Sequence, residues 1–333
     1  MKPFLVDVPV VIYLWIRPQL QRETFAPVCE ARPSTLFLIS DGGRNEAEWE
    51  KIYESRRIVE SMIDWDCKVY KLYEEKNNGM YAMMRKTNAF VFAVVDRAIV
   101  FEDDTIADPS YYAFCAELLE KYKDDLRIQG IAGRILVDEN TETPYDYFFS
   151  GYMGPGTGDA VWKRTTQIFD TDDWLKEPYY RNGILRMLPG FKTVYKQLDV
   201  DGRYDGHLPG SEFYYALQKR LEGQLCICAK KNMVRQMGAT DDATHGVEWR
   251  KLDKKTQRAY VQEVHPCTFP LKHPPYVMRD VRYDATAKKI SGSKLELQRR
   301  KFVTRCKRLW YGDGILMWKS FVKRYIKRDI REN

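Results

Sequence analysis

The chain has 333 residues, of which 44% are hydrophobic and 30% are charged, and its formal net charge is +7. This composition excludes an intrinsically disordered chain, and the length is ample for a large core. Because no run of about 18 apolar residues occurs, the sequence predicts no transmembrane helix. The apolar run at 8–16 is too short to span a bilayer and ends at Arg17-Pro18, which favours a buried strand over a signal peptide.

The positive charge is concentrated at one end of the chain. Residues 288–333 contain 15 Lys and Arg against 4 Asp and Glu, a net charge of +11. The other 287 residues contain 39 Lys and Arg against 43 Asp and Glu. Their net charge of −4 argues against a nucleic-acid-binding body.

The seven cysteines have no repeating spacing, so we expect buried free thiols in a reducing compartment, with Cys226 and Cys228 on one face of a strand.

The first 135 residues alternate between strand and helix patterns. Continuous apolar runs at 9–16 and 36–40 are typical of strands covered on both faces. Asn45, with Glu48 three residues later, resembles a capping box for a helix whose apolar stripe includes Trp49, Ile52, Tyr53, Val59 and Ile63. The pattern then predicts a strand at 67–73, a helix at 80–95, a strand at 98–102, a helix with Asp108 as N-cap and Pro109 as first residue, and a strand at 127–133.

This alternation predicts right-handed βαβ units and a mostly parallel sheet, which binds ligands at the carboxyl ends of its strands. Polar residues follow three of the predicted strands at that edge: Arg17, then Asp41 with two glycines, then Asp103-Asp104. Residues 136–210 are rich in aromatics and glycine and predict loops with short helices. A clear helix at 211–223, stopped by Gly223, then leads into another strand.

The strand at 98–102 ends in three adjacent acids, Glu102, Asp103 and Asp104. Adjacent carboxylates repel, so we expect a positive partner from elsewhere. A hard divalent cation, Mn²⁺ or Mg²⁺, fits because it prefers oxygen ligands and can bridge protein carboxylates to a diphosphate. The alternative is solvated loop charge; the position between an apolar strand and a helix that begins with proline favours the metal.

The stretch "IVFEDDTIADPSYYAFCAELLEKYKDD", 99–125, resembles the aspartate-motif segment of bacterial GT-A-fold nucleotide-sugar glycosyltransferases of the polysaccharide and O-antigen type. "LFLISDGGR" is similar to the second strand of that family, and "NNGMYAMMRKTNAFVFAV" to the segment before the metal strand. "GDAVWKR" resembles a degraded Trp-rich segment, with Thr157 and Asp159 where aromatic residues are usual. The similarity continues through 210–246 to an acceptor-side helix, a strand and a closing run, and covers roughly residues 8 to 246.

The resemblance implies a role for each matching residue. Asp41 would bind the uracil or ribose, Gly79 would lie close to the nucleotide, and Asp103 would contact the ribose or the sugar. Asp104 would ligate the metal, and His245 would approach the diphosphate or complete the metal shell. Glu212, where the family often has Asp, would be the general base of an inverting transfer.

Each assignment from the sequence has an alternative. Glu212 at a helix start is also favourable with the helix dipole or in an ion pair. His245 could be a surface or core residue. Arg17 could end a strand or contact a phosphate or base. Asp201, Asp205 and His207 form a second acidic group, but no Glu follows at the twelfth position, so we reject an EF-hand in favour of a solvated loop.

The last part of the chain has a separate pattern. Residues 315–330 place apolar and aromatic side chains largely opposite lysines and arginines. Such a helix could bind an anionic membrane surface, pack on the body or, less favourably, bind nucleic acid. A membrane role would place the protein on the cytoplasmic side, as a peripheral protein on the inner face of the cell membrane.

The sequence therefore predicts a GT-A catalytic domain at 1–255, with a nucleotide-binding half at 1–135 and an acceptor half at 136–255. A basic extension follows at 256–333. The predicted activity is metal-dependent, inverting transfer of a sugar from a UDP-sugar to a saccharide or lipid-linked saccharide in surface polysaccharide assembly. The rivals are a nucleotidyltransferase, for which the first strand lacks a glycine-rich phosphate loop, and a non-catalytic degenerate transferase fold that binds a membrane or partner.

Overall fold

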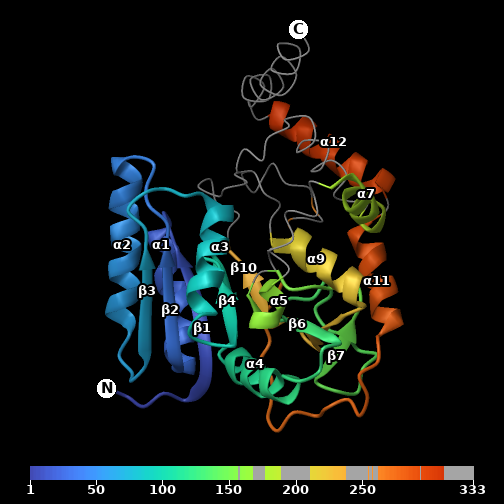
Figure 1. Cartoon of the computed structure of the whole chain (residues 1–333), viewed down its shortest axis with the longest axis horizontal. Coiled ribbons are helices and arrows are strands. Elements are labelled where there is room, and N and C mark those ends of the chain that lie inside the picture. Colours follow the sequence, from blue (N-terminus) through green and yellow to red (C-terminus); the bar gives the residue numbers. More distant parts are fainter. Residues whose placement is uncertain are drawn as a thin grey trace. The chain divides into compact units, whose positions relative to one another are not determined.

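The computed structural model describes residues 1–156, 158–167, 177–188, 211–237, 254, 257, 262–292 and 294–310 (Figure 1). The chain divides into two compact units. The first comprises Met1–Met237 with Gln262–Ala287, and the second comprises Gly238–Val261 with Lys288–Asn333.

The first unit contains an eight-stranded sheet of order β3-β2-β1-β4-β8-β6-β9-β7. Its strands are β1 Val6–Leu14, β2 Pro33–Ser40, β3 Lys68–Tyr73, β4 Arg97–Phe101, β6 Ile128–Ala132, β7 Tyr147–Ser150, β8 Asp159–Trp162 and β9 Leu225–Ala229. Pairing is parallel from β3 to β4 and between β6 and β9, whereas β8 and β7 pair antiparallel with their neighbours. The predicted class, a mostly parallel α/β sheet with flanking helices, is confirmed.

A short second sheet lies after β4. In it β5 (Thr105–Ala107) pairs antiparallel with β10 (Val234–Gln236). The helices of the described residues are α1 Pro18–Ala31, α2 Glu46–Met62, α3 Met80–Val91, α4 Ser110–Lys121, α5 Lys163–Thr166, α7 Pro178–Met187, α9 Ser211–Glu222, α11 Val281–Ser291 and α12 Lys294–Trp310. No described helix is long and apolar enough to cross a bilayer.

Helices cover both faces of the sheet, and the sequences of its central strands are therefore continuous apolar runs. In β1 the even-numbered side chains from Val8 to Leu14 join a core that includes Phe25 and Val28 of α1. The intervening Val11 joins a core on the opposite face with Met83 and Val91 of α3. Because successive side chains of a strand point to opposite faces, α1, α2 and α4 cover one face and α3 covers the other.

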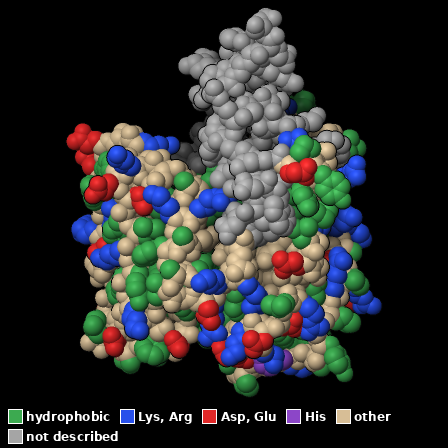
Figure 2. Space-filling model, in the orientation of Figure 1, with side chains coloured by type: hydrophobic (Ala, Val, Ile, Leu, Met, Phe, Trp, Pro, Cys, Tyr) green, Lys and Arg blue, Asp and Glu red, His purple; other side chains and the backbone are tan. Residues whose placement is uncertain are grey.

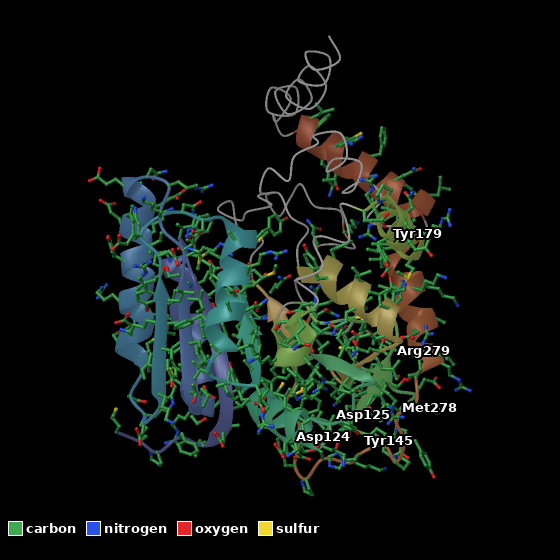
Figure 3. The ribbon with its side chains drawn as sticks, in the orientation of Figure 1. Asp124, Asp125, Tyr145, Tyr179, Met278 and Arg279 are labelled. Atoms are coloured by element: carbon green, nitrogen blue, oxygen red, sulfur yellow. The ribbon has the colours of Figure 1, made fainter. Side chains whose placement is uncertain are left out.

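Beyond β8, the second face is covered by α11. Cys226 and Cys228, on one face of β9 as predicted, are buried with Phe148 of β7 and Tyr283 of α11. Asp284 secures this helix: its carboxylate accepts hydrogen bonds from Ser150 Oγ at 2.5 Å and from the Gly151 amide at 3.0 Å. Arg279, labelled in Figure 3, donates to the same carboxylate through Nε. Residues 262–287 are thereby attached to the end of β7.

Most predicted elements of the first 135 residues form close to their expected positions, but three details differ. The sequence predicts no helix between the first two strands, and the structure has α1 there, with Pro18 in its first turn and Pro27 inside it. The N-cap of α4 is Pro109 rather than Asp108, whose Oδ1 accepts from the Ser110 amide at 2.9 Å. Tyr53, expected on the buried stripe of α2, is 61% exposed and stacks on Trp49.

The cysteines match the expected burial only in part. All seven cysteines are free, and three of them are buried, but Cys306 is exposed, unlike the buried thiol expected there. On the face in Figure 2, described Lys and Arg side chains are intermingled with Asp and Glu. This mixture follows from the small net charge of residues 1–287.

Candidate functional site

The carboxyl ends of β2, β1 and β4 lie side by side at one edge of the sheet. Leu14 pairs with Ser40, and Ile12 pairs with Phe101, so the residues that follow these strands emerge at neighbouring positions. Adjacent strands are about 4.8 Å apart, so the residues after β2 and β4 are separated by about 10 Å. The predicted convergence of Arg17, Asp41 and the acidic cluster at one edge is therefore present.

Arg17 supplies the positive partner that the acidic cluster requires. Its Nη1 donates to Asp103 Oδ1 at 3.0 Å and to Asp104 Oδ2 at 2.8 Å. All three side chains are largely buried, with exposed fractions of 6%, 14% and 12%. The end of β1 thus provides one cation for two acids at the end of β4.

The ion-paired group leaves one carboxylate oxygen without a partner. Asp104 Oδ1 is buried and accepts no hydrogen bond from the residues that the structure describes. Gln21, on the first turn of α1, is also buried and donates weakly to the main-chain oxygens of Arg17 and Asp103 at 3.3 and 3.4 Å. The α1 helix therefore holds both strand ends from one side, while Asp104 retains unused acceptor capacity.

Burial raises the pKa of Asp103 from 3.8 to about 6, with the charge of Arg17 opposing the rise and that of Asp104 adding to it. The folded state therefore holds this proton more tightly than the unfolded chain. Stability from this group is fully present below pH 3.8 and is lost as the pH rises through about 6. This difference in proton affinity between the folded and unfolded states corresponds to about 3 kcal/mol of folding free energy.

In the variant Asp103→Asn this carboxyl group is absent, so we expect the free energy of unfolding to lose the pH dependence that the group causes. In metal-free denaturant unfolding, wild type should lose stability relative to the variant between pH 3.8 and about 6, and the difference should then stay constant. A difference between the two proteins that does not change with pH would contradict the raised pKa.

Asp41, at the end of β2, binds the loop that precedes α3. Its carboxylate accepts from the amides of Asn78 at 2.9 Å and Gly79 at 2.8 Å, and from the side chain of Asn78 at 3.0 Å. Asn77 Nδ2 adds a longer contact at 3.3 Å. Asp41 therefore holds this loop through hydrogen bonds, and its predicted contact with a nucleoside stays a prediction.

Two glycines in this region are required by backbone geometry. A Cβ at Gly42 would lie 2.5 Å from the carbonyl carbon of Lys76, so only glycine allows the two loops to approach this closely. Gly79 has φ of 82° and precedes the first residue of α3, a conformation that other residues adopt at a cost. Nothing lies within 4 Å of a Cβ built at Gly79, so a side chain would fit there. Glycine is favoured at this position because of the positive φ, not because of a lack of space.

The last described residues before His245, Gln236 and Met237, lie beside the acidic cluster of Glu102, Asp103 and Asp104. The Met237 amide, at the end of β10, donates to the main-chain oxygen of Asp104 at 2.7 Å. Gln236 Nε2 donates to Glu102 Oε2 at 3.2 Å. His245 itself lies outside the described residues, as do Asp201, Asp205, His207 and residues 315–330.

Glu212 lies in the first turn of α9, where only its backbone is described. This helix packs near α3: Arg85 Nη2 donates to the Tyr214 hydroxyl at 3.0 Å, and Met84 lies against the cluster that contains Phe213. The first turn of α9 therefore belongs to the same side of the sheet as α3. The role of Glu212 as a general base stays a prediction.

The residues at this edge fit a divalent cation in kind and number. Mg²⁺ and Mn²⁺ commonly take only one or two carboxylates from a protein, and Asp104 Oδ1 is an acceptor without a partner among the described residues. Within the same described ranges, no three His, Cys, Asp or Glu side chains gather as a ready-made metal cage. A cation would therefore share or take over the carboxylates that Arg17 contacts.

Sequence reasoning missed the residues that support the predicted ones. Gln21, Asn77 and Asn78 each donate to the main chain or carboxylates of the site. The Asn-Asn-Gly run was a usable signal, because these residues favour turns and local hydrogen bonds. A pocket of about 410 Å³ that includes Lys2, Arg32 and Asp64 lies at the opposite ends of the strands and has no part in this site.

The sequence matches no family model and no curated protein. Among solved structures, the fold of this chain is similar to the mannosyltransferase PcManGT from Pyrobaculum calidifontis in complex with GDP-Man and Mn²⁺. The identity is 12% and the TM-score 0.34, over 50% of this chain and 48% of that one. The match thus spans about half the length of each protein.

Proposed function

We propose that this chain is a glycosyltransferase. It would move a sugar from a nucleoside-diphosphate sugar, with UDP as the first candidate nucleotide, to a saccharide or lipid-linked saccharide. One observation carries the proposal: two adjacent buried carboxylates, Asp103 and Asp104, lie with Arg17 at the ligand-binding edge of a mostly parallel sheet. Cell-surface polysaccharide assembly on the cytoplasmic side of the membrane is the setting that we propose for this activity.

Asp104, with Asp103, would hold a Mn²⁺ or Mg²⁺ ion. Such an ion neutralises charge that develops on a leaving diphosphate. Arg17 lies against both carboxylates and has further N–H groups, so it would be placed to donate to a diphosphate oxygen. Asp41 would keep the loop before α3 in place, with Gly79 beside the nucleotide.

The acceptor side of the proposed reaction depends on α9. Glu212 would accept the proton of the attacking hydroxyl, which is the step that an inverting transfer requires. His245 follows Met237 by eight residues, a length of chain that can return to Asp104 from the end of β10. We propose that it contacts the diphosphate from the far side.

A second candidate is a non-catalytic module with a transferase-like fold. The observation that favours it is that Arg17 already compensates the two acids, as a purely structural ion pair would. In that case neither a nucleotide nor a cation is needed at this edge, and the protein would act through a membrane or partner surface.

A thermal-shift panel separates the two candidates. UDP, GDP and their sugars are each added with and without Mn²⁺ to wild type and to Asp104→Asn. Because a ligand that binds only the folded state raises Tm, the enzyme proposal predicts a rise for at least one diphosphate that requires both Mn²⁺ and Asp104. No shift with any nucleotide, or equal shifts in both proteins, would favour the module.

A further inference from the structure

Helix α12 has several exposed apolar side chains. Leu295, Phe302 and Trp310 are 77%, 66% and 87% exposed, and Leu309 is 56% exposed. Four polar side chains of the same helix are half-buried, namely Glu296, Arg300, Thr304 and Lys307, whereas Gln298, Arg299 and Arg305 are exposed. In a helix that serves only to pack on its own chain, the apolar side would be covered instead.

The two sets of side chains form opposite stripes. Leu295, Phe302, Cys306 and Leu309 are separated by seven, four and three residues, which places them on one side of an α-helix. Glu296, Arg300, Thr304 and Lys307 follow one another by four, four and three residues on another side. The exposed apolar stripe runs along the helix and is interrupted between Leu295 and Phe302 by the exposed side chains of Gln298 and Arg299. Exposed apolar side chains that share one side of a helix indicate an interaction surface.

The charges beside the stripe determine which partner fits. The exposed charged side chains described in α12, Arg299 and Arg305, are both cationic, whereas the described acid, Glu296, lies on the half-buried stripe. Residues 288–333 carry a net charge of +11. A second copy of this surface would bring like charges together, whereas a surface of negative headgroups above hydrocarbon complements both the arginines and the apolar side chains.

We propose that the exposed apolar side of α12 docks on an anionic lipid bilayer, with Leu295, Phe302 and Leu309 entering the interface and Arg299 and Arg305 contacting headgroups. This surface is distinct from residues 315–330, and the proposal does not depend on the catalytic one, because the stripe exists whether or not the protein transfers a sugar. It uses the exposed residues of one helix in the second unit.

The test is flotation of the full-length protein with vesicles of phosphatidylcholine alone or mixed with phosphatidylglycerol. Wild type should bind the mixed vesicles at least about tenfold more strongly than the neutral ones. The triple variant Leu295→Ser, Phe302→Ser, Leu309→Ser should lose about tenfold or more on the mixed vesicles, since it removes most of the apolar contact. The control Met278→Ser, at a side chain of the first unit that is 75% exposed, should bind as wild type.

A second variant keeps the apolar stripe and reverses its charge. Arg299→Glu with Arg305→Glu should abolish the preference for phosphatidylglycerol without changing the helical content. The proposal is overturned if the triple variant binds like wild type, or if wild type binds neither vesicle. It is also overturned if sedimentation shows that the stripe holds two copies of the chain together and the triple variant separates them.

Discussion

Arg17→Ala should lower the free energy of unfolding by about 3–5 kcal/mol in metal-free buffer, the cost of leaving a buried ion pair without one partner. The substitution leaves Asp103 and Asp104 buried side by side without the guanidinium that contacts both. Urea unfolding near neutral pH measures the loss. Mn²⁺ should restore part of it in the variant, because a cation held by the same carboxylates replaces the missing charge.

The matched control is Arg127→Ala. Arg127 pairs with Asp125 at 2.6 Å, but its side chain is 64% exposed. Exposed pairs contribute about 0–1 kcal/mol, so this variant should unfold almost like wild type. If both variants lose the same small amount, Arg17 is not the essential counter-charge of the acidic cluster.

The proposed function makes Asp104 a metal ligand, so Asp104→Asn should reduce the proposed sugar transfer by about 10³-fold while the protein remains folded. Losing such a ligand would remove several kcal/mol of charge stabilisation from the leaving diphosphate. Asparagine keeps the size of the side chain and Arg17 keeps its contact with Asp103, so the fold should survive. Turnover of the donor that gives the largest thermal shift is the measurement.

The control for this variant is Asp125→Asn. Asp125, labelled in Figure 3, pairs with the exposed Arg127 and lies just before the first residue of β6, whereas the predicted site residues follow the carboxyl ends of β1, β2 and β4. It should retain full activity. Activity of Asp104→Asn within a few-fold of this control would remove Asp104 from the mechanism.

The parts of the fold that sequence predicted well are those with a strong period and clear ends. The strand at 36–40 and the helix capped by Asn45 form because a continuous apolar run and a side chain that accepts from the Glu48 amide each specify local structure. Helix α1 was missed because Pro27 inside it opposes helix formation locally, and the burial of Phe25 and Val28 overrides that preference.

The site shows the same division between local and distant information. The sequence predicted that Arg17 and Asp103-Asp104 would meet at one sheet edge, because each follows a strand. It could not show that the guanidinium itself contacts both acids, since 86 and 87 residues separate the partners and the pairing depends on which strands are neighbours. The expected cation was a metal, whereas the structure places an arginine in contact with the same oxygens.

The central claim is that the acids at the end of β4 bind a cation together with a nucleoside diphosphate. Crystals grown with Mn²⁺ and UDP, measured at the manganese absorption edge, test this most directly. The account predicts an anomalous peak within bonding distance of the Asp104 carboxylate and between it and the diphosphate, with Arg17 turned toward a phosphate oxygen. A peak and nucleotide elsewhere, with Arg17 still bound to Asp103 and Asp104, would contradict it.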